Sequence, residues 1–290
     1  MAIRYRRATV DGLSVFYREA GDPGRPTLLL LHGFPTSSVM FRDLIPLLAD
    51  DFHLIAPDLP GFGQTDMPTV EEFDYTFDHL ADVIDKFVDQ LGLGPFGIYV
   101  QDYGSPVGFR LALKRPDQVR AIITQNGNAY EEGLVPEFWA PLREFWADWN
   151  PTTEAPVAGA LTPDTTVWQY LHGEPDPELV SPDAIALDNA LLARPGAREV
   201  QLKLFHDYRT NPPLYPSWQE FLRERHPGVL AVWGGNDQIF GPDGARAFAK
   251  DVPDAEIHLL DAGHFALESQ AHTIAALIRD FAPKHLAQNV

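Results

Sequence analysis

Apolar runs and helical periodicity alternate along most of the chain. Two N-terminal runs, 4–10 and 13–19, alternate apolar and polar positions as half-exposed strands do, and Asp11 and Gly12 between them predict a turn. Further short runs that are mostly apolar predict strands buried inside a sheet. These runs are 27–31, 53–57, 96–101, 119–124, 228–234 and 255–260.

Apolar residues spaced three and four positions apart predict helices between these strands. The clearest pattern covers residues 77–91, where Leu80, Ile84 and Phe87 recur at helical spacing. Further helical patterns are found at 38–48, 106–113 and 271–281. Strands that alternate with helices are typical of a mainly parallel sheet with helices on both faces, so we expect the α/β class.

The alternation stops in the middle of the chain. Residues 129–225 contain helical and loop patterns, many aromatic residues and no buried strand run. We therefore expect an α/β core formed by 1–128 and 226–290, with 129–225 inserted as a helical cap. The aromatic residues are typical of packing inside such a cap. A cap placed over the end of the sheet would also enclose an apolar pocket.

Composition excludes several kinds of partner. The net charge of −19 argues against nucleic acid and anionic membranes, and no apolar run is long enough to span a membrane. The chain contains no cysteine, which excludes disulfides, thiolate metal sites and a cysteine nucleophile. No signal segment is visible, so we expect a cytoplasmic protein. We expect neither a cofactor nor a metal ion.

Asp102 follows the strand run 96–101 directly. Small residues, Gly104 and Ser105, come next, and the helical pattern then begins at 106. This is the strand, sharp turn and helix of a nucleophile elbow, with Asp102 at the apex. A carboxylate there attacks an sp³ carbon and forms an alkyl ester, so we expect an electrophilic alkyl substrate. The alternative is that Asp102 only caps the following helix.

Two further residues follow predicted strands in the order expected for a catalytic triad. Asp237 comes after 228–234, and His264 comes after 255–260. Open α/β sheets place their sites at these carboxyl ends, and the order nucleophile, acid, histidine fits this fold. After 27–31, the backbone N–H of Phe34 is expected to form an oxyanion hole with that of Tyr103.

These motifs resemble the α/β-hydrolase superfamily, specifically its branch of epoxide hydrolases and haloalkane dehalogenases. The resemblance is carried by 32–38, 56–63, 102–105 and 261–265. It implies a mostly parallel eight-stranded sheet flanked by helices, with an inserted helical cap. It also implies that the nucleophile forms an ester with a small apolar electrophile, and that water activated by the histidine and acid hydrolyses this ester.

The two reactions of this branch differ in what receives the leaving group. The resemblance implies two cap tyrosines for an epoxide oxygen, and indole or amide N–H donors for a halide. Tyr215 resembles the later cap tyrosine. Trp168 stands where the earlier tyrosine is expected, with Tyr170 two residues on, and Trp168 also resembles a cap halide donor of one dehalogenase group. Each of these three residues is also explained by packing alone.

We predict a hydrolase that opens epoxides to diols. A haloalkane dehalogenase is the alternative, and a non-catalytic ligand-binding protein on the same fold is a third hypothesis. A fluoroacetate-type dehalogenase fits less well, because Tyr103 stands where that group carries an arginine. The sequence leaves a homo-oligomer open.

Overall fold

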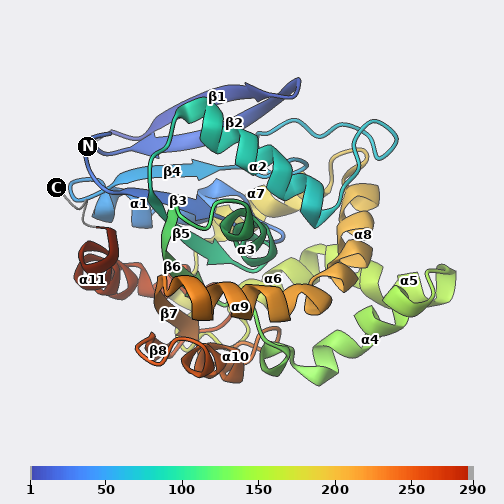
Figure 1. The fold of residues 1–290 in the computed structure, drawn as a ribbon. Coiled ribbons are helices and arrows are strands. Elements are labelled where there is room, and N and C mark those ends of the chain that lie inside the picture. Colours follow the sequence, from blue (N-terminus) through green and yellow to red (C-terminus); the bar gives the residue numbers. More distant parts are fainter. Residues whose placement is uncertain (1, 287–290) are drawn as a thin grey trace.

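The computed structural model describes residues 2–286 and contains one eight-stranded sheet (Figure 1). Its strand order is β1-β2-β4-β3-β5-β6-β7-β8. Strand β2 runs antiparallel to both of its neighbours, and every other adjoining pair is parallel. The strands are β1 Arg4–Val10, β2 Leu13–Ala20, β3 Thr27–Leu31, β4 His53–Pro57, β5 Phe96–Gln101, β6 Val119–Gln125, β7 Gly228–Gly234 and β8 Glu256–Leu260.

Helices cover both faces of this sheet, which confirms the predicted α/β-hydrolase architecture (Figure 1). The α-helices are α1 Leu44–Leu48, α2 Phe77–Leu91, α3 Gly104–Lys114, α4 Pro136–Ala147, α5 Pro151–Ala158, α6 Pro163–Leu171, α7 Pro182–Leu192, α8 Ala197–Asp207, α9 Tyr215–Arg225, α10 Pro242–Ala247 and α11 Leu267–Leu286. The short 3₁₀ helices are η1 Ser38–Phe41, η2 Glu131–Gly133, η3 Gly159–Leu161, η4 Pro177–Leu179, η5 Tyr208–Thr210, η6 Pro212–Leu214 and η7 Phe248–Lys250.

Strand β3 shows how one apolar run serves two cores. Leu28 and Leu30 belong to the core beneath α1 and α11, whereas Leu29 and Leu31 belong to the core beneath α2 and α3. All four leucines have no exposed surface. Alternate side chains of a strand point to opposite faces, so a strand covered on both sides must be apolar throughout.

The helix predicted for 38–48 is divided into η1 and α1. Pro46 explains the division, because it has no N–H to donate to the carbonyl of Arg42 in a continuous helix. Helix α11 begins before the predicted residue 271 and ends beyond 281, with a non-helical Gln270 near its start. These differences change element ends and leave the predicted order intact.

All of the named elements between β6 and β7, from η2 to α9, are helices. Helices α4 and α5 extend away from the sheet in Figure 1. Helix α9 lies inside the predicted cap range but packs on α3 of the core, so the boundary at 225 stays a prediction.

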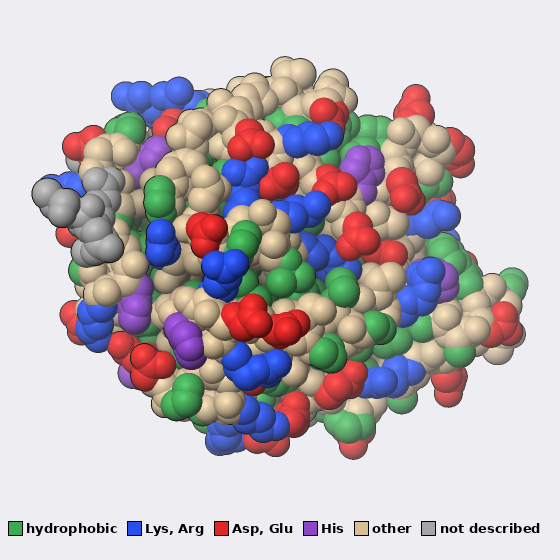
Figure 2. All heavy atoms as spheres, in the orientation of Figure 1, with side chains coloured by type: hydrophobic (Ala, Val, Ile, Leu, Met, Phe, Trp, Pro, Cys, Tyr) green, Lys and Arg blue, Asp and Glu red, His purple; other side chains and the backbone are tan. Residues whose placement is uncertain are grey.

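No helix among residues 2–286 is long and apolar enough to cross a membrane. Acidic and basic side chains intermingle on the face shown in Figure 2.

Candidate active site

Asp102 stands at the turn between β5 and α3 with a left-handed backbone (φ +46°). Strand and helix approach closely here, and glycine permits it: a Cβ at Gly104 would lie 2.1 Å from the carbonyl oxygen of Leu31. A left-handed conformation at a residue other than glycine is uncommon and needs support from its surroundings. The sharp turn leaves the Asp102 side chain at the apex, 6% exposed.

The two carboxylate oxygens of Asp102 have different neighbours. Oδ1 accepts the backbone N–H of Phe34 at 2.9 Å and that of Tyr103 at 2.5 Å. Oδ2 lies 3.8 Å from Nε2 of His264. The backbone at Gly33 fits beside this carboxylate only without a side chain, since a Cβ there would lie 2.3 Å from Cβ of Asp102. Both N–H groups of the predicted oxyanion hole therefore point at one oxygen, and the other remains directed toward the histidine.

His264 lies between two carboxylates. Its Nδ1 is 2.8 Å from Oδ2 of Asp237, so the three residues predicted as a triad lie together. Asp237 is held in turn by the N–H of Ile239 at 2.7 Å and by the side-chain amide of Asn126 at 2.8 Å. Asn126 follows β6 with φ +48° and was not predicted. In sequence it looked like one of several turn residues after that strand.

Burial and charge oppose one another at these groups. Burial raises the pKa of Asp102, against the lowering effects of His264 and of the N–H groups of Phe34 and Tyr103. Burial by itself lowers the pKa of His264, but the nearby carboxylates of Asp237 and Asp102 outweigh it and the net direction is upward. The two carboxylates therefore favour a proton on His264, while burial opposes charge on both Asp102 and the histidine.

A small cavity of about 40 Å³ opens beside Asp102 under the cap. Most of the residues that line the cavity are apolar. Besides Asp102, five lining residues carry polar groups in their side chains. These are Tyr103, Trp139, Thr165, Gln169 and Tyr208. The volume is enough for small molecules such as water and is far below that of a typical drug-sized site.

The structure does not bring the three predicted cap residues to the lining of this cavity. The hydroxyl of Tyr170 donates to Asp188 at 2.7 Å, and its ring stacks on Phe265 with centroids 4.0 Å apart. Trp168 stacks against Phe138. The hydroxyl of Tyr215 accepts from the side chain of Asn128 at 3.3 Å, one layer behind the lining. Their predicted role as leaving-group donors is not supported by these positions.

Two other tyrosines are better placed. Tyr103 and Tyr208 both line the cavity, with ring centroids 6.0 Å apart. Among the described residues the buried hydroxyl of Tyr103 has no hydrogen-bond partner. The hydroxyl of Tyr208 interacts with that of Tyr215. Tyr215 was expected because it resembles the later cap tyrosine of epoxide hydrolases, and no signal in the chain distinguished Tyr208, seven residues earlier.

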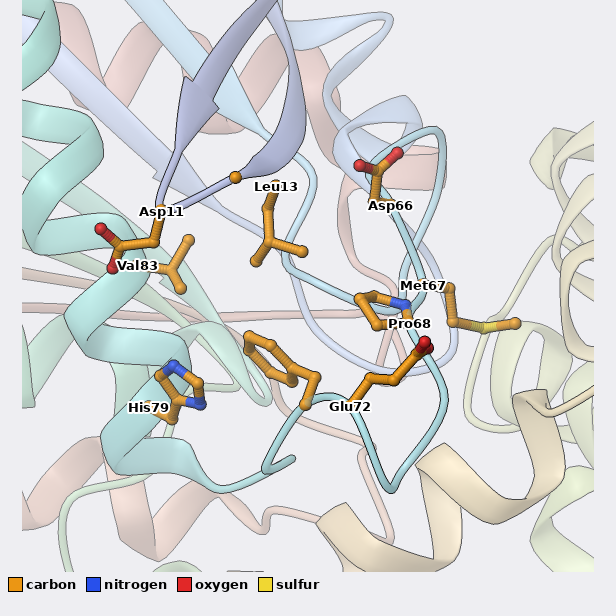
Figure 3. Close-up of a pocket in the computed structure, with 10 residues that line it drawn as sticks. Asp11, Leu13, Asp66, Met67, Pro68, Glu72, His79 and Val83 are labelled. Atoms are coloured by element: carbon orange, nitrogen blue, oxygen red, sulfur yellow. The ribbon is translucent and has the colours of Figure 1, made fainter.

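A larger hollow of about 670 Å³ lies elsewhere, between the β1–β2 turn, the loop at 66–68 and α2 (Figure 3). Its acidic groups already have partners: Asp11 pairs with Lys86, Asp66 accepts from the N–H of Ser14, and Glu72 accepts from a backbone N–H. None of the triad residues lines it. Within residues 2–286 no cluster of His, Asp and Glu has the arrangement of a metal site.

Comparison with known proteins gives the same fold. Residues 26–271 match the family described as alpha/beta hydrolase fold. An uncharacterized hydrolase of Saccharomyces cerevisiae is 51% identical over 268 residues, which cover 91% of this chain and 92% of the relative. A haloalkane dehalogenase of Mycobacterium marinum is 29% identical over 271 residues, covering 92% and 88%.

A solved structure of an epoxide hydrolase, CorEH without ligand, superimposes with a TM-score of 0.76. It is 23% identical, and the match covers 98% of this chain and all of the other. At that identity the likeness concerns the fold alone.

Proposed function

The chain belongs to the α/β-hydrolase fold family and is a hydrolase, and we propose that it opens small epoxides through an ester on Asp102. The substrate is a small electrophile and the second reactant is water. The proposal rests on one observation above all: the residues that line the cavity beside Asp102 include two tyrosines, Tyr103 and Tyr208.

In the first step Oδ2 of Asp102 attacks an epoxide carbon. A bond forms between Oδ2 and that carbon, the carbon–oxygen bond of the epoxide breaks, and the developing alkoxide takes a proton from a tyrosine hydroxyl. Oδ1 stays on the N–H groups of Phe34 and Tyr103, which fixes the direction of Oδ2. The negative charge passes from the carboxylate through the opening oxygen to the tyrosine, and the products are a neutral hydroxyalkyl ester and a tyrosinate.

In the second step His264 takes a proton from water at Nε2. The hydroxide adds to Cγ of Asp102, and Oδ1 becomes the oxyanion that the N–H groups of Phe34 and Tyr103 stabilise. Asp237 stabilises the imidazolium through Nδ1. The ester bond then breaks, and the departing diol oxygen takes the proton from His264. Asp102 is left as a carboxylic acid with one oxygen from water. Its proton passes through solvent to the tyrosinate, which restores both the carboxylate and the tyrosine hydroxyl.

The donors in the cavity favour an epoxide over a halide. A tyrosine O–H solvates the opening oxygen and also transfers its proton, whereas an indole N–H only solvates. The indole N–H of Trp139 already donates to the carbonyl of Ile239 at 2.8 Å, and Trp168 does not line the cavity. Neither of these two indole N–H groups is therefore offered to a leaving group in this arrangement.

A haloalkane dehalogenase remains the second candidate, for two reasons. The relative from Mycobacterium marinum carries that name, and the side-chain amide of Gln169 lines the cavity as an alternative N–H donor. A ligand-binding protein without catalysis is a weaker hypothesis, because binding alone gives no reason to hold His264 between Asp237 and Asp102.

Single-turnover alkylation rates with a short epoxide and a bromoalkane test the proposal. Tyr208→Phe and Tyr103→Phe are expected to slow epoxide opening about tenfold to a thousandfold, as loss of an oxyanion donor does. Tyr75→Phe is the matched control, because it loses one bond to the carbonyl of Pro68 away from the cavity. Bromide release that exceeds epoxide opening, with epoxide rates unchanged in both lining variants, would favour the dehalogenase.

A further inference from the structure

Gln101, the last residue of β5, contacts the ring of His264 directly. Its side-chain Nε2 lies 3.0 Å from Nε2 of His264, and the residue has no exposed surface. Its Oε1 is buried without a hydrogen-bond partner among the described residues. A Cβ at Gly33 would lie 2.3 Å from this Oε1, so the amide occupies a space that only glycine leaves open.

With the amide in this orientation, the contact favours one location for the proton of His264. The carboxylate of Asp237 can only accept, so Nδ1 must be the donor in that pair. In this orientation the amide nitrogen of Gln101 faces the ring and can only donate, so Nε2 is the acceptor. Both partners are satisfied together only when the imidazole is neutral and its lone pair is on Nε2.

Other groups around the ring favour the opposite state. The charged groups that face His264 are Asp237 after β7 and Asp102 after β5, and both stabilise an imidazolium. The rings of Phe240 and Phe265 supply apolar contacts on the remaining sides. Gln101 is the neighbour whose contact opposes protonation of Nε2 in this arrangement.

We propose that Gln101 is a positioning residue that opposes protonation of His264 at Nε2, so that this nitrogen can take a proton from water. The role rests on the proposed function, since it concerns the base of the ester-hydrolysis step. Gln101 does not line the cavity, so the role assigned to it acts through His264. When the hydrolytic water binds, its O–H replaces the Gln101 amide as the donor to Nε2 of His264. The proton of the water then moves to this nitrogen, which carried a lone pair and no proton.

The test begins with the free enzyme, in which the titration of His264 is followed by NMR of the ring nitrogens. Gln101→Met removes the donor and keeps a similar side-chain length. Because a net hydrogen bond between neutral groups is modest, the pKa of His264 is expected to rise by about 0.5 to 1 pH unit. Gln101→Glu, whose volume matches glutamine, places an acceptor at Nε2 and is expected to raise it further.

Gln125→Met is the matched control. Gln125 is also fully buried and donates to His264, but to the backbone carbonyl at 2.8 Å and not to the ring. Loss of this hydrogen bond is expected to lower the stability of the protein and to leave the pKa of His264 unchanged. An unchanged or lowered His264 pKa in Gln101→Met, or an equal rise in Gln125→Met, would overturn the proposal.

Kinetics then connect the contact with turnover. In Gln101→Met the rate of ester hydrolysis is expected to reach its plateau at a pH about 0.5 to 1 unit higher, with the alkylation rate unchanged. A uniform loss of rate at every pH would indicate a merely structural role and contradict the proposal. The free-enzyme titration needs no substrate, so it reads the Gln101 contact even if no ester forms on Asp102.

Discussion

Asp188 on α7 links stability to pH through a buried contact between cap and core. Its side chain has no exposed surface and accepts a hydrogen bond from Tyr170 on α6. Thr36 and Glu268 of the core lie beside it, and Arg42 holds Glu268 with N–O distances of 2.9 and 2.6 Å. Burial raises the pKa of Asp188 to about 7, and Tyr170, Thr36 and Arg42 offset only part of that effect.

The sign and size of the pH effect follow from this pKa. Between about pH 4 and pH 7 the folded state keeps a proton on Asp188 that the unfolded chain has lost, so the free energy of unfolding falls as pH rises. A folded pKa of about 7 in place of the ordinary 3.8 corresponds to about 4 kcal/mol across that interval. Below about pH 4 Asp188 is protonated in both the folded and the unfolded state, so it adds no further pH dependence to the free energy of unfolding.

Urea unfolding of the wild type and of Asp188→Asn, at several pH values from 4 to 8, measures the effect. The amide has the size of the carboxyl group and does not titrate here, so the difference between the two proteins isolates Asp188. As pH rises, the free energy of unfolding of the variant is expected to increase relative to that of the wild type, by about 4 kcal/mol at most. A difference that stays flat from pH 4 to 8 would refute a protonated Asp188 in the folded protein.

Three further outcomes are expected. His264→Gln should form the alkyl ester and fail to release it, so intact-mass analysis after substrate addition should show an adduct on Asp102; an unmodified variant would contradict the role of His264. Asn126→Ala removes the 2.8 Å bond to Asp237 and should slow ester hydrolysis about tenfold to a hundredfold, as loss of a bond to a charged group does, which single-turnover kinetics would check. Gly104→Ala should destabilise the protein by about 1–3 kcal/mol, because its Cβ would meet the carbonyl oxygen of Leu31. In thermal unfolding Gly159→Ala is its control, since nothing lies within 4 Å of the added carbon, and equal effects would refute the steric explanation.

The fold and the neighbourhood of the candidate nucleophile were readable from the sequence because their signals are local. A strand such as β3 must be apolar on both faces, and an elbow needs small residues such as Gly104 after its apex. Parallel strands bring their carboxyl ends to one edge, so Asp102, Asp237 and His264 could be expected together although they are far apart in the chain. Their distances agree with that expectation, while their catalytic roles stay predictions.

Tertiary structure alone decided which side chains complete the site. Asn126 and Gln101 resemble ordinary turn and strand residues in sequence, and only strand pairing brings them to Asp237 and to the ring of His264. In the cap, aromatic residues cover several helix faces, so periodicity cannot say which face meets the cavity. Packing placed Tyr208 at the lining and Tyr215 behind it. Local pattern specifies which elements form, whereas the facing of a side chain between packed helices depends on contacts distant in the sequence.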